Sequence, residues 1–292
     1  MRVGVTGADG LLGATLVPLW RRAGADVAAW TLDAFDVRDA AATRRAVVAD
    51  RPDVVVHLAA WTDVDGAEAD PDAALAVNRD GTAHVAAACR EAGARLVVLS
   101  TDYVFDGSAR RPIPPDTVPA PRGAYARSKA AAEAAVASCS GPWTILRTGW
   151  LFGPGGRNFV DTVRAAAAAG RALRVVDDQV GAPTSSRLVA EGLWGLVRAG
   201  KTGRWHLAAA GAASWFEVAR EVFRAAGADP LRVTACRTAE AGRAAPRPAY
   251  SVLDCRATEA ALGMALPRWE AHVAAYLATG RVPALGLIEG DA

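Results

Sequence analysis

The chain has 292 residues, of which 52% are apolar by the AVILMFWYC count and 22% are charged. This composition suffices for a buried core, and the length allows one large domain or two modest ones. Thirty-three Lys and Arg against 31 Asp and Glu give a formal charge of +2. So balanced a charge, without a run of basic residues, argues against a nucleic-acid partner. Every apolar stretch is broken before the ~20 residues that a membrane span requires, so we expect no membrane partner.

The cysteines are scattered, without C-x-x-C pairs or histidines at zinc spacing. They are Cys89, Cys139, Cys236 and Cys255. We predict that they are buried thiols in a reducing compartment and that the chain has no metal site. The first residues run directly into an apolar strand instead of a charged and cleavable leader, which favours a cytoplasmic protein.

The first half of the chain alternates short β-branched runs with longer segments of helical pattern that are rich in Ala, Arg and Glu. Runs so continuously apolar are typical of parallel strands covered on both faces. The expected strands are Arg2–Val5, Val27–Trp30, Val54–Leu58, Leu96–Ser100 and Trp143–Arg147. Right-handed crossovers between them predict a doubly wound, Rossmann-type parallel sheet of the α/β class.

After about Leu151 this rhythm loosens, and we expect a smaller C-terminal α/β lobe packed over the carboxyl edge of the sheet. Residues 1–152 would form the dinucleotide-binding domain, to which a helix at 185–200 returns. Residues 153–184 and 201–285 would form the substrate-binding lobe. Its expected elements are helices at Asn158–Ala169 and Ser214–Ala226 and strands at Leu173–Val176 and Trp205–Ala208.

A glycine loop of the form G-x-x-G-x-x-G follows the first strand and opens the first helix, with Gly7, Gly10 and Gly13 as its glycines. Gly7 would permit the tight turn, Gly10 the approach of backbone to a pyrophosphate, and Gly13 close packing of helix on strand. The helix N-terminus would face the anion. The loop therefore predicts a dinucleotide site, and the alternative is an ordinary strand-to-helix turn.

The second strand ends at Thr31 without the acidic residue that often holds the ribose hydroxyls of NAD. The nearest acids, Asp33 and Asp36, come later. This favours NADPH as the cofactor, with NADH as the alternative. The basic residues that could lie near a 2′-phosphate are Arg2, Arg21 and Arg22.

Tyr125 and Lys129 lie one turn apart on one helix face. A tyrosine with its ordinary pKa of about 10 is a poor acid–base catalyst at neutral pH, and an adjacent ammonium lowers that pKa. Such pairs are also common on helix surfaces. This one follows a glycine loop and a strand that ends in Ser100 and Thr101, either of which could donate a hydrogen bond to a carbonyl oxygen. The combination predicts a carbonyl reductase.

These segments resemble extended short-chain dehydrogenase/reductases, and specifically the dTDP-4-dehydrorhamnose reductase family of deoxysugar pathways. The resemblance runs from Val3 to about Leu277. Besides the glycine loop and the Tyr–Lys pair, it is carried by Leu58-Ala59-Ala60-Trp61-Thr62-x-Val64-Asp65, STDYVF at 100–105, Arg147-Thr148-x-Trp150, DQ-x-G-x-PT at 178–184 and Arg247-Pro248-x-x-Ser251. The STDYVF and DQ-x-G-x-PT segments separate this family from the related epimerases and dehydratases better than the glycine loop does.

The resemblance implies a role for each matching position. Thr101 would polarise the C4 carbonyl of a sugar, Tyr125 would protonate its oxygen, and Lys129 would tune Tyr125 and hold the nicotinamide ribose. The implied cofactor-binding residues are Gly7, Asp9, Gly10, Leu11, Leu12, Gly13, Asp36, Val37, Leu58, Ala59, Ala60, Tyr125 and Lys129. The implied substrate-binding residues are Thr101, Asp102, Tyr103, Trp150, which would wall the pocket, and Arg247, which would help hold the diphosphate.

The implied activity is NAD(P)H-dependent reduction of the C4 keto group of a nucleotide-linked 4-keto-6-deoxysugar, foremost dTDP-4-dehydro-L-rhamnose to dTDP-L-rhamnose. Open alternatives are a reductase for another dTDP-deoxysugar, such as one on a dihydrostreptose route, and an epimerase or dehydratase that recycles its cofactor. A non-catalytic dinucleotide-binding regulatory subunit is a further alternative, against which the complete Thr101, Tyr125 and Lys129 set argues. The expected partner is a small-molecule sugar nucleotide, and a homodimer stays open. Trp61 departs from the family, where a smaller or polar residue is common, and this leaves the sugar open.

Four further residues have alternative interpretations. Asp65 and Glu68 have the spacing of a helix capping box, with Asp in place of Ser or Thr. Asn78 either supports the backbone of the active site or is an ordinary polar helix residue. His57 ends the third strand and is expected to be a hydrogen-bonded core histidine rather than a cofactor contact.

Overall fold

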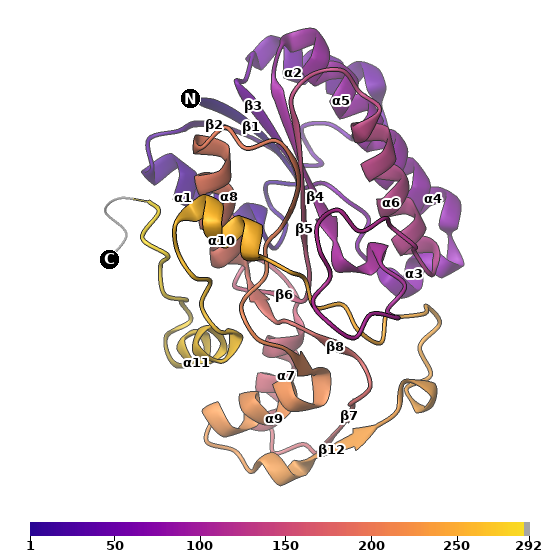
Figure 1. The fold of residues 1–292 in the computed structure, drawn as a ribbon, viewed down its shortest axis with the longest axis vertical. Helices are drawn as coiled ribbons and strands as arrows, with labels where there is room; N and C mark the ends of the chain where they lie inside the picture. Colours follow the sequence, from indigo (N-terminus) through magenta and orange to yellow (C-terminus); the bar gives the residue numbers. More distant parts are fainter. Residues whose placement is uncertain (289–292) are drawn as a thin grey trace.

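The structure, a computed structural model, describes residues 1–288 and is built on a parallel sheet with helices on both faces (Figure 1). Six strands are ordered β10-β5-β4-β3-β1-β2, and every neighbouring pair is parallel. The strands are β1 (Arg2–Thr6), β2 (Asp26–Trp30), β3 (Val54–His57), β4 (Arg95–Thr101), β5 (Trp143–Thr148) and β10 (Gly203–His206). The predicted doubly wound α/β fold is confirmed.

Each strand supplies a core on both faces of the sheet because successive side chains point to opposite sides. Val97 lies in the core beneath α1 and α8, whereas its neighbour Val98 lies in the core beneath α2, α5 and α6. The helices of the first face are α1 (Gly13–Arg22) and α8 (Ser186–Arg198). Those of the second are α2 (Ala40–Asp50), α5 (Gly81–Ala92) and α6 (Ala124–Ala137), with α3 (Val64–Ala69), α4 (Pro71–Leu75) and a π-helical turn at Ala76–Asp80 beside α6.

The sixth strand corrects one expectation. The apolar pattern predicts a strand at Trp205–Ala208 in the substrate lobe, whereas β10 covers Gly203–His206 and joins the main sheet beside β5. Pairing begins where Gly203 meets Thr144. Leu207 and Ala208 after β10 are buried, and the Leu207 N–H still donates to the Arg147 carbonyl of β5, so the apolar run extends past the strand and shifts its predicted position.

The smaller lobe lies below the carboxyl edge of the sheet in Figure 1. Its helices are α7 (Phe159–Ala168), α9 (Trp215–Ala225) and α11 (Trp269–Thr279), while α10 (Arg256–Leu262) packs on α8. Three strand pairs connect its loops: β7 (Leu173–Val176) with β12 (Val233–Cys236), β8 (Val180–Gly181) with β11 (Ala213–Ser214), and β6 (Leu151–Phe152) with β9 (Thr184–Ser185). Short 3₁₀ turns cover Asp102–Val104, Pro230–Arg232 and Thr238–Glu240.

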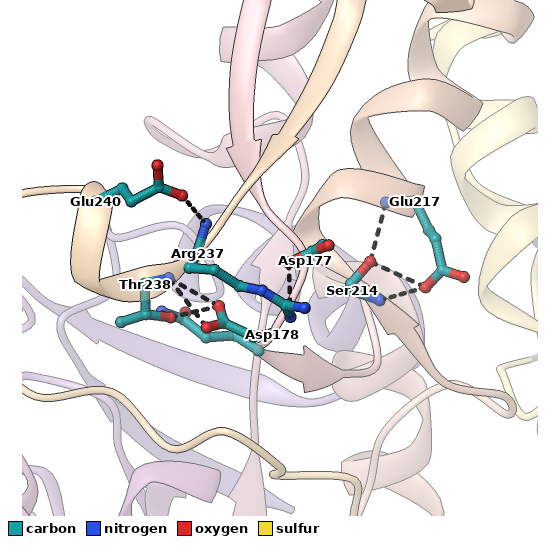
Figure 2. Close-up of polar contacts among 8 residues, drawn as sticks. Asp177, Asp178, Ser214, Glu217, Arg237, Thr238 and Glu240 are labelled. Carbon is teal, nitrogen blue, oxygen red and sulfur yellow. Dashed lines mark hydrogen bonds and ion pairs between the residues drawn. The ribbon is translucent and has the colours of Figure 1, made fainter.

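Carboxylates organise the loops of this lobe, as Figure 2 shows. Asp178 accepts hydrogen bonds from the backbone N–H and the hydroxyl of Thr238, at 2.9 and 2.6 Å. Ser214 and Glu217 form a reciprocal capping box at the start of α9, which satisfies two backbone donors at the helix end. The first aspartate of the DQ-x-G-x-PT segment therefore ties its loop to the turn after β12.

A buried ion pair joins α6 to the sheet. The Glu133 carboxylate accepts from Arg147 Nε and Nη2 at 2.8 and 2.7 Å and from Ser100 Oγ at 2.6 Å. The Glu133 and Arg147 side chains are 2% and 0% exposed. Arg147 Nη1 donates to the Pro115 carbonyl as well. Such a pair is favourable only while every charge is matched, so it fixes α6 against β4 and β5.

We predict that Glu133→Ala lowers the free energy of unfolding by about 3–5 kcal/mol, because it leaves the Arg147 guanidinium buried and unpaired. Urea denaturation measures this loss. The control is Glu91→Ala, which breaks the exposed pair with Arg44 and should cost no more than about 1 kcal/mol. Equal losses in the two variants would show that the buried pair is no more important to stability than a surface pair.

Candidate active site

One cleft of about 930 Å³ runs along the carboxyl ends of the sheet strands and reaches the smaller lobe. This edge is where open α/β sheets bind ligands. The predicted site residues that line it are Gly7, Asp9, Gly10, Leu11, Leu12, Gly13, Asp36, Val37, Leu58, Ala59, Ala60, Thr101, Asp102, Tyr103, Tyr125 and Trp150. Two predicted site residues, Lys129 and Arg247, are held by protein partners beside the cleft.

The glycine loop has the shape that a pyrophosphate cradle requires. Gly7 has a φ of +63°, and a Cβ there would lie 2.7 Å from the backbone nitrogen of Ala59. A Cβ on Gly13 would lie 2.3 Å from the carbonyl oxygen of Gly7. Side chains are thus excluded from both positions, and backbone N–H groups at the start of α1 can approach an anion. The loop fits a dinucleotide.

Tyr125 and Thr101 meet over the ends of β4 and α6. Tyr125 lies in the first turn of α6, which Gly123 opens with a φ of +83°. The Thr101 hydroxyl lies close enough to that of Tyr125 to lower the phenol pKa against the effect of burial, and both residues line the cleft. Thr101 Oγ1 also donates to Asp102 Oδ1 and accepts from the backbone N–H of Tyr103, each at 3.2 Å. The two hydroxyls proposed for carbonyl chemistry therefore converge.

Lys129 lies beneath these hydroxyls and is 6% exposed. Its Nζ donates to the carbonyl of Leu99 at 2.7 Å. Burial lowers the pKa of Lys129 to about 8. Burial also raises the pKa of Tyr125 to about 12, although the nearby Thr101 hydroxyl acts in the opposite direction. Tyr125 is therefore protonated at neutral pH, as a proton donor must be, and its tuning by Lys129 stays a prediction.

Asp102 has its carboxylate turned toward protein groups and is 2% exposed. It accepts from Thr101 and lies near the Ser251 side chain. It is also so close to Gly149 that a Cβ there would be 2.4 Å from the carboxylate. Burial raises the pKa of Asp102 to about 6. Direct contact with substrate stays a prediction for this residue.

The hydrogen bonds of Asn78 and His57 decide between the alternative roles that the sequence leaves open for them. Asn78 accepts from the backbone N–H of Trp61 and donates to its carbonyl and to Ser128 on α6. Its side chain thus supports the backbone of the active site. His57 is 2% exposed and bonded to Thr6 and Thr82, which confirms the expected core histidine. Burial lowers its pKa to about 3, so it is neutral.

The predicted capping box at Asp65 is wrong. Helix α3 is capped by Asp63, whose carboxylate accepts from the backbone N–H of Gly66. The Asp65 carboxylate instead binds Arg247 through two hydrogen bonds of 2.9 and 3.1 Å. Glu68 does not cap α3. Its carboxylate accepts from the backbone N–H of Ala124, the first residue of α6. Spacing alone could not tell which of two neighbouring aspartates sits at the start of the helix.

Arg247 is therefore already paired. Its bond to Asp65 holds the pKa of that carboxyl at about 2, and Arg247 also lies near the Tyr103 side chain. This network ties the loop around Arg247 to α3 and to the STDYVF segment. Contact between Arg247 and a diphosphate stays a prediction. So does contact of Asp36 with adenine, since the Asp36 carboxylate accepts from Arg38 Nε at 2.9 Å.

The lobe extends the predicted Trp150 wall with two aromatic residues that the sequence did not reveal, Trp215 and Phe159. Trp150 stacks on Trp215 with ring centroids 3.5 Å apart and an interplanar angle of 4°. Phe159 packs edge-on against Trp215 at 4.6 Å. Trp150 has a φ of +53°, a conformation that costs roughly 1–3 kcal/mol in a non-glycine residue. Gly181 permits it, because a Cβ there would lie 2.3 Å from the Trp150 ring.

Trp215 and Phe159 were missed because nothing in the local pattern of α9 or α7 shows that its first residue faces the cleft.

Two of the three basic residues that the sequence offers for binding a 2′-phosphate contact other protein groups. Arg2 pairs with Asp50, and Arg21 donates to the Val27 carbonyl.

Neither a metal cluster nor a membrane span emerges from residues 1–288. In that range no three His, Cys, Asp or Glu side chains gather as metal ligands would. None of the helices there combines the length and the apolar character needed to cross a bilayer.

A glycine cradle, a Tyr–Lys helix and a strand-end threonine around one cleft define a reductase of the short-chain dehydrogenase/reductase class. Comparison with known proteins narrows the class. The family model described as RmlD substrate binding domain matches residues 1–282. A dTDP-4-dehydrorhamnose reductase of Streptomyces griseus is 45% identical over 274 residues, covering 91% of this chain and 90% of the relative. The chain therefore belongs to the dTDP-4-dehydrorhamnose reductase family, as its motifs predicted.

Two further relatives bear on the activity. A dTDP-4-keto-6-deoxy-D-glucose reductase of Streptomyces niveus is 43% identical over 250 residues, covering 85% of this chain and 87% of the relative. The crystal structure of a dTDP-4-dehydrorhamnose reductase from Bacillus anthracis in complex with NADP matches with a TM-score of 0.91 at 33% identity. The match covers 96% of this chain and 99% of that one.

The lowered pKa of Lys129 predicts a pH dependence. Burial disfavours the ammonium, so Lys129 loses its charge as the pH rises through about 8, while Tyr125 keeps its proton to about 12. We expect kcat/KM for NADPH, which reports the free enzyme, to fall above pH 8. In Lys129→Arg, whose cation does not titrate, this fall should vanish. A fall near the pKa of Tyr125 instead would assign the alkaline limb to the phenol.

Proposed function

We propose that this chain reduces the C4 keto group of a dTDP-linked 4-keto-6-deoxysugar, with dTDP-4-dehydro-L-rhamnose as the first candidate and dTDP-L-rhamnose as the product. NADPH is the proposed cofactor, with NADH as the alternative. The observation that carries the proposal is that Thr101 and Tyr125 line one cleft together with the glycine cradle, close enough for the Thr101 hydroxyl to influence the pKa of Tyr125. The Bacillus anthracis relative was crystallised with NADP, which supports the cofactor.

The proposed roles follow from the positions of the side chains. When bound, the reduced nicotinamide supplies the hydride that the carbonyl carbon accepts. Tyr125 donates its proton to the carbonyl oxygen, because it stays protonated at neutral pH and its hydroxyl lies in the cleft. Thr101 orients that hydroxyl and polarises the carbonyl, and Lys129 holds the ribose.

The two parts of the chain would bind different ligands, the cofactor and the sugar nucleotide. Residues 1–152, with 185–200, would bind the cofactor, and residues 153–184 and 201–285 would supply most of the substrate pocket, apart from β10 in the main sheet. Trp150 and Trp215 offer a flat apolar wall, which suits a sugar ring and its methyl group. The described cysteines are all free thiols, which supports a cytoplasmic location.

A second candidate keeps the same chemistry but changes the sugar. The 43% identity to a protein named dTDP-4-keto-6-deoxy-D-glucose reductase favours it, since that name gives a sugar of the D series. Incubation with NADPH and dTDP-4-keto-6-deoxyglucose, with and without a 3,5-epimerase, separates the two at 340 nm. Consumption only with the epimerase supports the rhamnose product. Consumption without it supports the second candidate, and no consumption with either contradicts both.

We predict that Tyr125→Phe lowers kcat by about 10²–10⁴ and leaves NADPH affinity near the wild-type value, since only the proton donor is lost. Single-turnover kinetics and fluorescence titration measure the two quantities. The matched control is Tyr276→Phe, which removes a hydroxyl that donates to Asp161 outside the cleft lining and should leave kcat near the wild-type value. Wild-type turnover in Tyr125→Phe would assign the proton to another group.

A further inference from the structure

We propose that Arg157, in the loop between β6 and α7, binds the pyrophosphate of the dinucleotide and completes its cradle from the lobe side. The inference rests on the proposed function only in requiring a dinucleotide in the cleft. Arg157 lies outside every motif that carries the family resemblance, and its position next to the glycine loop comes from the structure.

The loop that carries Arg157 packs directly on the glycine loop. A Cβ on Gly155 would lie 2.6 Å from the carbonyl oxygen of Leu11 and 2.9 Å from the Ala14 side chain. A Cβ on Gly156 would be in ordinary contact with Leu11, 3.6 Å from its side chain. The glycines let this backbone lie against the first turn of α1, and Arg157 follows them at once. Its side chain lines the cleft together with the glycine loop itself.

The charges along the cleft favour an anion at this position. Among the described lining residues, Arg38 and Arg157 are the two with cationic side chains. Arg38 is already neutralised by Asp36 at 2.6 Å, at the far end of the cleft. Arg157 is exposed and makes no hydrogen bond or ion pair with any residue in 1–288. It is therefore the cleft cation that is available to a ligand.

The glycine loop itself lacks a positive side chain. Asp9 contributes a carboxylate to the same stretch of cleft, and the first turn of α1 holds no basic residue. The positive end of the helix offers only partial charge, equivalent to about half a proton. A pyrophosphate with two negative charges would thus meet one carboxylate and a helix terminus. A guanidinium opposite them supplies the missing countercharge and can donate two hydrogen bonds at once.

The test compares ligands that contain the pyrophosphate of the dinucleotide, NADPH and ADP-ribose, with ligands that lack it, 2′-AMP and dTDP. Tryptophan fluorescence reports binding, because Trp30, Trp61, Trp150 and Trp215 line the cleft. We expect Arg157→Ala to weaken NADPH and ADP-ribose alike, by about tenfold at low salt, since a charged hydrogen bond is lost. Binding of 2′-AMP and of dTDP should stay at the wild-type level. Arg157→Lys should recover part of the loss, and added salt should reduce it.

Arg171→Ala is the matched control, because Arg171 is an exposed lobe arginine outside the cleft lining. Its NADPH affinity should equal that of the wild type, and thermal melting should show all three variants folded. Wild-type NADPH affinity in Arg157→Ala overturns the proposal. A loss of affinity confined to dTDP also overturns it, because it would assign Arg157 to the sugar nucleotide. A loss of affinity confined to 2′-AMP overturns it as well. These readouts need no turnover, so they stand even if the sugar substrate proves different.

Discussion

The active site depends on how α6 is held against the sheet. Its first turn carries Tyr125, its second carries Lys129, and its third carries Glu133, which reaches Arg147 and Ser100 on β5 and β4. Because both charges of the Glu133–Arg147 pair are buried, any shift of the helix would leave one of them unmatched at a cost of several kcal/mol. The pair thus fixes the distance between the tyrosine and the strand ends.

Smaller contacts extend this frame to the cofactor side and to the lobe. Asn78 holds the backbone after β3 against α6, and the Asp65–Arg247 pair holds the lobe loop against α3. Burial keeps Tyr125 protonated and makes Lys129 the group that titrates near pH 8. The two groups therefore differ in how they titrate. The Tyr125 phenol stays protonated at neutral pH, whereas the charge of the Lys129 amine depends on its surroundings.

The sheet could be predicted from sequence because each buried parallel strand is a continuous apolar run between helical segments. Five of the six strands lie within one residue of their expected bounds. The sixth, β10, was displaced because its buried run continues beyond its pairing with β5. The glycine loop and the Tyr–Lys pair were predictable because their spacing is local. Trp215, Phe159 and Arg157 were not, since they reach the cleft only through the packing of the lobe.

The central claim is that two hydroxyls converge on one oxygen of the sugar. A crystal structure of the protein with NADP⁺ and dTDP-L-rhamnose tests it most directly. We expect the C4 oxygen of the sugar to lie within hydrogen-bonding distance, about 2.5–3.0 Å, of both Thr101 Oγ1 and the Tyr125 hydroxyl. The nicotinamide should face the opposite side of that carbon. A sugar bound with its C4 oxygen turned toward other residues, at full occupancy, would contradict the account.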